Sequence, residues 1–232
     1  MRIGIMQPYF FPYIGYFQLI NAVDKFVVYD DVTFIKQGWI NRNNILLNDK
    51  ASLFTVPLDG ASSNKLIHEI PVRNLAVWRK SFYKTITQNY KKAPFFEPTL
   101  KILELVLNTD VPDISRLCFN SLQYTLAYLE INTQVIPSSR IYNNQNLKAQ
   151  ERVIDICLRE KALHYINPIG GALLYAPDIF RKNGLALNFL KSRPILYKQF
   201  KNEFVPWLSM IDVLMFNSPA EIKQLLNQYD LV

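Results

Sequence analysis

Two groups of polar side chains near the start of the chain have types and spacing that suit chemistry. They are Gln7, Tyr9, Tyr13 and Tyr16 in an aromatic-rich loop, and the adjacent carboxylates of Asp30 and Asp31. An amide and three phenols can hydrogen-bond a ligand whose rings stack on aromatic side chains. A carboxylate that is partly removed from water has a raised pKa and can act as a general base at neutral pH. Together, with Gln7 as a donor, they predict a catalytic cleft.

The segments around these groups predict how they are brought together. Residues 2–5 are typical of a buried strand, residues 17–23 of a short helix, and residues 25–29 of a second strand. Such a βαβ unit has parallel strands, and open α/β sheets bind ligands at the carboxyl ends of their strands. The aromatic loop and the two aspartates both follow strand ends. The alternative is that the aromatic side chains of the loop pack into the core.

The two aspartates are expected to differ, because successive strand residues face opposite sides of a sheet. If the strand ends at residue 29, Asp30 continues on the apolar side of Phe26 and Val28, and Asp31 turns away. Asp30 would then be the general base. Alternatively, it would accept hydrogen bonds from a ribose, as the acid after the second strand does in Rossmann domains. A third interpretation makes both aspartates solvated turn residues.

A stacking ring, an amide and a guanidinium follow Gly38 within four positions. They are Trp39, Asn41 and Arg42. A guanidinium can bind a phosphate or a carboxylate through two hydrogen bonds. The alternative is a surface arginine that pairs with Asp30 or Asp31.

A later strand, predicted over residues 163–167, ends in a second candidate segment. Asn167 closes this strand, and Gly170 and Gly171 would let backbone N–H groups approach a ligand closely. A helix that began near Ala172 could receive a phosphate or carboxylate at its N-terminus. The alternative is a tight turn between strand and helix.

Residues 208–216 are apolar nearly all round, which predicts a buried helix. Ser209 and Asp212 lie about 60° apart on such a helix. A buried carboxylate must be paired or hydrogen-bonded, so both residues are candidates for substrate binding. Alternatively, Ser209 is the N-cap and Asp212 closes an arrangement like a capping box.

The remaining patterns predict an α/β protein with a Rossmann-like mixed or parallel sheet and a helical insertion in the middle third. We expect a single domain, residues 1–232, with a helical subdomain at about 76–130. The expected strands cover residues 43–47, 51–57, 68–72, 133–136, 163–167 and 186–190. The expected helices cover residues 76–92, 100–107, 115–129 with Asp110 as N-cap, 149–161, 208–216 and a last one that begins at Ser218.

Composition narrows the class of protein and the kind of partner. The net charge is +7, from 26 basic and 19 acidic residues, which favours anionic partners such as a nucleotide-linked sugar, a nucleic acid or an acidic membrane surface. No stretch is apolar enough to span a membrane or to act as a signal peptide, so a cytoplasmic protein is expected. Two cysteines and two histidines, far apart, predict buried thiols and no metal site.

Several runs of the sequence resemble the WbqC-like protein family. The strongest match is MQPYFFPYIGYFQLINAVDKFVVYDDV with KQGWINRN after it, and the weaker matches are YINPIGG with Leu174 and Tyr175, YKQF, and FVPWLSMIDVLMF. These runs extend from one end of the chain to the other. The resemblance implies that Gly15, Gln37 and Tyr175 also belong to the substrate site.

The resemblance also implies a function. Members of the family are associated with the biosynthesis of O-antigen lipopolysaccharide and other surface polysaccharides, and a glycine transferase role has been proposed for them. We therefore expect a transferase that attaches an acyl or aminoacyl group, such as glycyl, to an amino sugar carried on a nucleotide. The activated donor would be an aminoacyl-tRNA, an acyl-CoA, or ATP plus an amino acid, so tRNA is a possible partner.

Two other functions stay open at this point. The layout of strand, loop, helix and strand through residue 28 is similar to cytidylyltransferase-like Rossmann domains, which suggests an adenylate-forming or nucleotidyl-transfer enzyme. Those domains carry His-x-Gly-His where this chain has Tyr13-Ile14-Gly15-Tyr16, and two phenols cannot bring positive charge to phosphates. The third hypothesis is a non-catalytic binding protein of the polysaccharide assembly pathway.

Overall fold

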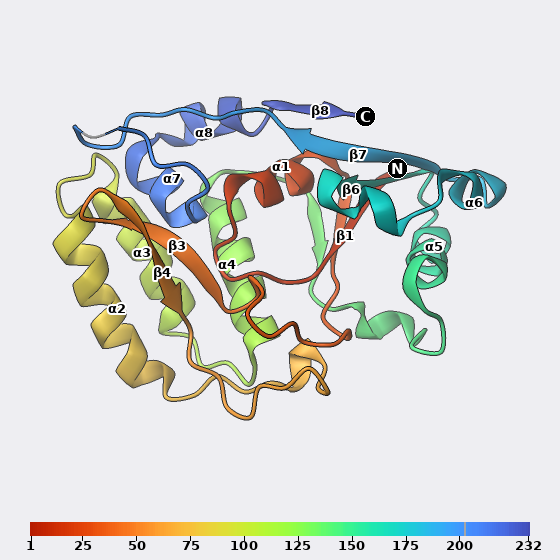
Figure 1. Cartoon of the computed structure of the whole chain (residues 1–232), viewed down its shortest axis with the longest axis horizontal. Coiled ribbons are helices and arrows are strands. Elements are labelled where there is room, and N and C mark those ends of the chain that lie inside the picture. The colour runs from red at the N-terminus through yellow and green to blue at the C-terminus, as the bar shows by residue number, and fades with distance from the viewer. Residues whose placement is uncertain (202) are drawn as a thin grey trace.

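The computed structural model of the chain describes residues 1–201 and 203–232, and its centre is a six-stranded sheet (Figure 1). The strands lie in the order β5-β2-β1-β6-β7-β8, all parallel except β8, which is antiparallel to β7. They are β1 (Arg2–Met6), β2 (Lys25–Val28), β5 (Gln134–Ile136), β6 (His164–Pro168), β7 (Ala186–Ser192) and β8 (Tyr229–Leu231). This confirms the expected Rossmann-like α/β fold.

The strand order reverses between β1 and β6. Helix α1 (Ile14–Ala22) leads from β1 to β2 on one side, and α5 (Ala149–Arg159) leads from β5 back across to β6 on the other side of β1. From β6, helix α6 (Pro177–Lys182) continues to β7 in the same outward direction. In sheets of this kind, the crevice at such a switch point is where ligands bind.

Both faces of the sheet are covered, because alternate strand residues enter two different cores. Phe26 and Val28 belong to the larger core, with α1 and with α4 (Ile114–Tyr128). Ile3, Ile5 and Val27 belong to the smaller core, with α5 and α6. Because both faces of β1 and β2 are buried, the sequences of these two strands are apolar at nearly every position.

The insertion between β2 and β5 builds the other half of the molecule (Figure 1). It contains the antiparallel hairpin β3 (Arg42–Leu47) and β4 (Lys50–Thr55), the 3-10 turn Ile67–Glu69, α2 (Leu75–Tyr90), α3 (Phe96–Leu107) and α4. Two short helices near the C-terminus, α7 (Met210–Phe216) and α8 (Pro219–Leu225), close the larger core. No helix within residues 1–201 and 203–232 is long and apolar enough to cross a membrane.

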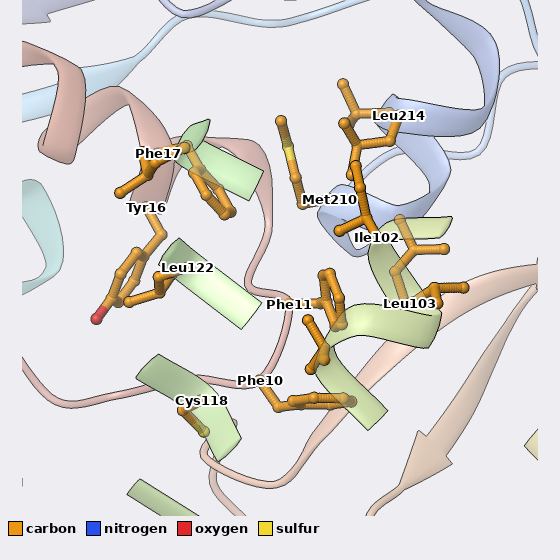
Figure 2. Close-up of a cluster of buried hydrophobic side chains, with 14 of the residues drawn as sticks. Phe10, Phe11, Tyr16, Phe17, Ile102, Leu103, Cys118, Leu122, Met210 and Leu214 are labelled. Atoms are coloured by element: carbon orange, nitrogen blue, oxygen red, sulfur yellow. The ribbon is translucent and has the colours of Figure 1, made fainter. Parts of the chain in front are cut away.

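Two of the loop aromatics tie the insertion to the sheet. Phe10 and Phe11 are fully buried, and Figure 2 shows them among side chains of α3 and α7 rather than in a solvent-facing cleft. Their rings meet edge to face with centroids 4.9 Å apart. Core packing, the alternative weighed for the loop, therefore holds for these phenylalanines.

Three local predictions were wrong. Residues 67–69 form a 3-10 turn where a strand over 68–72 was expected, and the Glu69 carboxylate accepts from the Leu66 N–H at its start. Val72 of the predicted strand forms an isolated bridge with Leu58. The N-cap of α4 is Asp113, whose carboxylate accepts from the Arg116 N–H, rather than Asp110. The segment after β6 is a 3-10 helix, Ile169–Leu174, rather than the start of an α-helix at Ala172.

Candidate functional site

A cavity of about 780 Å³ opens at the carboxyl ends of β1 and β6, where the strand order reverses. We call it the switch-point cleft. Its aromatic and polar lining residues are Gln7, Tyr9, Tyr13, Tyr29, Trp39, Asn167, Tyr175, Lys191, Ser192 and Trp207. The rest of the wall consists of Gly15, Gly170 and Gly171 and of the apolar residues Ile5, Met6, Ile35, Pro168, Ile169, Leu174 and Leu190. Volume and lining are those of a pocket for a small polar molecule with flat rings.

The loop after β1 is held so that its polar groups face the cleft. Tyr16 is buried and donates its hydroxyl to the Gln7 carbonyl at 2.8 Å, so it anchors the loop instead of reaching a ligand. The Gln7 carboxamide has no hydrogen-bond partner among the described residues and is available to a ligand. Gly15 allows close contact, because a Cβ there would overlap the Tyr13 ring and lie 2.7 Å from Ser192 Oγ.

The loop after β6 is held by its own strand. Asn167 is buried, accepts from the Tyr165 hydroxyl at 2.9 Å and donates to the Pro168 carbonyl at 3.2 Å. A Cβ on Gly171 would overlap the Asn167 amide nitrogen, whereas nothing lies within 4 Å of a Cβ on Gly170. Gly171 therefore sets the position of Asn167, and Gly170 keeps the wall open.

Two features of the protein give the cleft positive electrostatic potential. Lys191 is the one charged side chain among the described residues that line it. The N-terminus of α1 also lies here, since Gly15 of its first turn lines the cleft and the N-cap residue Tyr13 makes no side-chain cap. Backbone N–H groups at a helix N-terminus attract anions.

The phenols of the cleft are neutral at physiological pH. Burial raises the pKa of Tyr9, Tyr13, Tyr29 and Tyr175. A phenol with a raised pKa stays protonated at neutral pH, so it can donate a hydrogen bond but cannot act as a general base. These tyrosines are therefore suited to binding and stacking rather than to taking up a proton.

Asp30 lies beside the cleft, not in it. It is 1% exposed, and its carboxylate accepts from the Ser138 hydroxyl at 2.7 Å, the Ser115 hydroxyl at 2.9 Å and the Ser139 N–H at 3.2 Å. The expectation that Asp30 faces the ligand was wrong, because the 3-10 turn Ser139–Tyr142 and α4 cover the end of β2 with donors. Its lone pairs are used within the protein.

Asp31 is also buried, in an ion pair with Arg152 of α5. Its carboxylate accepts further from Ser139 and from Gln145. Neither aspartate lines the cleft or is a solvated turn residue. Asp31 is connected to the cleft through Arg152, whose guanidinium lies over the ring of the lining residue Tyr29.

The segment at 37–42 contributes one wall. Trp39 is 48% exposed and lines the cleft. Arg42 donates to the carbonyls of Gly38 and Gln37, and Asn41 donates to the Val56 carbonyl. Arg42 thus closes its own loop rather than binding a ligand or pairing with an aspartate.

Ser209 and Asp212 belong to the larger core. Ser209 is the N-cap of α7 and donates to the Phe11 carbonyl, as the capping alternative proposed. Asp212 does not complete a capping box. It accepts from Tyr197 at 2.6 Å, Gln199 at 2.7 Å and Tyr90 at 2.8 Å, and burial raises its pKa.

Sequence reasoning did not identify four of the aromatic and polar lining residues, namely Tyr29, Lys191, Ser192 and Trp207. Tyr29 directly precedes the aspartates, and its place at the end of β2 was the available signal. The strand predicted to end at residue 190 continues through Ser192, which brings Lys191 to the cleft. Trp207 arrives from the C-terminal segment, and no local pattern relates it to the first loop.

The chain is similar to known proteins over nearly its whole length. The chain matches the family model described as "WbqC-like protein family" over residues 7–224, a range that contains the polar groups of the cleft. It is 27% identical over 223 residues to "Uncharacterized protein Rv1507c" of Mycobacterium tuberculosis, which covers 95% of each chain. No solved structure matches the chain.

Proposed function

This chain belongs to the WbqC-like protein family, and on that premise we propose that it attaches an acyl or aminoacyl group to an amino sugar carried on a nucleotide. The family resemblance supports a role in surface-polysaccharide biosynthesis, and the residues of the cleft support the substrate class. The observation that carries the proposal is the combination of stacking rings, neutral hydrogen-bonding groups and one cation at the switch point of the sheet.

The proposed acceptor fits these groups part by part. The diphosphate would lie where the N-terminus of α1 meets Lys191, because both favour negative charge. A nucleobase would stack on the rings of the cleft wall, Tyr9 or Trp39. The carboxamides of Gln7 and Asn167 would then hydrogen-bond the sugar hydroxyls.

The reaction proposed for this site is nucleophilic acyl transfer. The lone pair of the sugar amine attacks the donor carbonyl carbon, a C–N bond forms, and the carbonyl electrons move to oxygen. When the carbonyl re-forms, the leaving group departs with its bonding electron pair and takes up the proton lost by nitrogen. The Lys191 ammonium, the Gln7 amide and the neutral phenols of the cleft are the proposed donors to the oxyanion.

The described lining of the cleft holds no carboxylate, and its phenols are neutral. The amine would therefore react as its own free base. Catalysis then rests on orientation and on stabilising the oxyanion. Asp30 and Asp31, whose carboxylates are satisfied internally, hold the cleft in shape and do not move the proton.

The test is an acylation assay read by mass spectrometry. The chain is incubated with a UDP-linked amino sugar and, in parallel, an acyl-CoA, an aminoacyl-tRNA, or ATP plus an amino acid. The UDP-linked hexose without the amine is the control substrate. The expected result is a product whose mass equals the acceptor plus the acyl group, formed only from the amino sugar.

Lysine variants connect the activity to the cleft. Lys191→Ala should weaken binding of the UDP-sugar about tenfold or more, because a hydrogen bond to a charged phosphate is lost. Lys198→Ala removes an exposed lysine outside the cleft and should leave binding unchanged. Product that forms only with ATP and releases pyrophosphate would favour the adenylate-forming alternative, and binding without product from any donor would favour the non-catalytic one.

A further inference from the structure

A second cavity, of about 610 Å³, opens beside the switch-point cleft. It lies between the end of β7, the segment that follows it and the starts of α1 and α7. The two cavities share five lining residues, which we call the neck. They are Tyr13, Gly15, Lys191, Ser192 and Trp207.

The walls of the second cavity are mainly apolar. They consist of Ile14, Pro194, Ile195, Leu196, Phe204, Pro206, Leu208 and Val213, and we call this cavity the apolar pocket. Leu208 and Val213 are buried, whereas Leu196 is 74% exposed at the rim.

The polar side chains of the apolar pocket are already engaged within the protein. Ser192 donates to Gln18 at 2.6 Å, and Tyr197 donates to the buried Asp212. The guanidinium of Arg193 is paired with Asp230. The side chains of Lys191, Tyr13 and Trp207 make no hydrogen bond to the described residues, and all three residues line the neck.

We propose that the apolar pocket binds the hydrocarbon chain of an acyl donor, with the acyl carbonyl at the neck. That this hydrocarbon belongs to the acyl donor rests on the proposed function. That the pocket binds a hydrocarbon chain rests on the pocket alone. At the neck, Lys191 can stabilise the carbonyl oxygen, and the amine arrives from the switch-point cleft. The same residues thus line both the binding site for the acceptor and that for the donor carbonyl.

Other occupants fit less well. A sugar or a nucleobase in the apolar pocket would leave its polar groups without partners, and each such group loses free energy on burial. A glycyl group is far too small to fill 610 Å³. A hydrocarbon chain needs no hydrogen bonds and gains free energy from every buried methylene.

The first experiment measures the binding of butyrate, hexanoate, octanoate and decanoate by calorimetry, below their micelle-forming concentrations. We expect affinity to rise about fourfold for each added methylene until the pocket is full, since burial of one methylene contributes about 0.8 kcal/mol. Affinity that does not depend on chain length would overturn the proposal.

Two variants and a matched control connect the binding to the pocket. Ile195→Trp fills the pocket and should weaken decanoate binding tenfold or more while butyrate binding changes little. Leu196→Asp puts a charge on an exposed rim residue without disturbing the core, and it should weaken decanoate binding as well. Leu173→Asp changes a fully exposed leucine outside the pocket. An equal loss of affinity in this control would overturn the assignment of the pocket.

Titration of the same variants with UDP separates the two proposals. Decanoate binding without UDP binding would overturn the nucleotide part of the proposed function and leave the apolar pocket standing. UDP binding without decanoate binding would overturn the apolar pocket alone. Decanoate and UDP that bind together, with Ile195→Trp affecting only decanoate, would support both.

Discussion

The guanidinium of Arg152 lies over the ring of Tyr29, 4.9 Å from its centroid, while it also pairs with the buried carboxylate of Asp31. Arg152 thus connects the buried Asp31 carboxylate to Tyr29, an aromatic residue in the wall of the switch-point cleft. Arg152 donates to the Asp31 carbonyl and to Asn144 as well, so its position is fixed from several sides. Asp31 therefore acts on the cleft through the position of Tyr29.

Arg152→Met should lower the free energy of unfolding by about 3–5 kcal/mol, because Asp31 would be left as a buried, unpaired charge. The combined variant Asp31→Asn with Arg152→Met should lose less than the sum of the two single changes. Chemical denaturation of all four proteins measures the coupling. Additive losses would show that the ion pair is not coupled in the folded state.

Gly171→Ala and Gly170→Ala form a matched pair. A Cβ at Gly171 would overlap the Asn167 amide nitrogen, whereas a Cβ at Gly170 meets nothing within 4 Å. Gly171→Ala should therefore cost about 1–3 kcal/mol of stability and weaken nucleotide-sugar binding through displacement of Asn167. Gly170→Ala should leave both unchanged. Thermal denaturation and calorimetric titration measure the two effects, and similar behaviour of both variants would contradict the prediction.

Asp212 should make stability depend on pH in a distinct way. Burial raises its pKa above the usual carboxyl value of 3.8, and its partners Tyr90, Tyr197 and Gln199 are neutral. The folded protein therefore holds this proton more tightly than the unfolded chain. The resulting stabilisation is fully present below the unfolded pKa and is lost as pH rises through the folded pKa.

Asp212→Asn removes this titration and serves as the reference protein. The unfolding free energy of the native chain minus that of Asp212→Asn should fall as pH rises above about 4 and should level off above the folded pKa. Urea unfolding at several pH values gives this difference. A difference that grows with pH would show that the core prefers the carboxylate, and a constant difference would show that the pKa of Asp212 is the same in the folded and unfolded states.

Cys118→Ser and Cys157→Ser should leave any transferase activity intact. Burial raises the pKa of the Cys118 thiol well above its usual value and that of Cys157 to about 12, so neither forms a thiolate nucleophile. A serine hydroxyl in these buried positions should cost about 1–3 kcal/mol. Unfolding curves and the acylation assay check the two parts, and loss of activity in a folded variant would point to thiol chemistry.

Much of the fold could be predicted from local sequence patterns. The apolar runs at 2–5 and 25–29, the helix between them and the later strand at 163–167 predict parallel strands, and they form β1, α1, β2 and β6. The capping sequence at Ser218 predicts the start of α8, where Ser218 and Glu221 form a capping box. These features depend on neighbours in the chain, which is why the sequence contains them.

The roles of the polar residues were decided by tertiary structure. Asp30 and Asp31 follow a strand, as a catalytic acid would, yet serines from α4 and from the turn after β5 satisfy Asp30, and Arg152 from α5 neutralises Asp31. Lys191 and Trp207 reach the cleft from segments that follow more than 170 positions after Tyr13. A carboxylate is reactive or structural according to the donors around it. Those donors come from distant segments, so local pattern specifies a strand end but not what surrounds it.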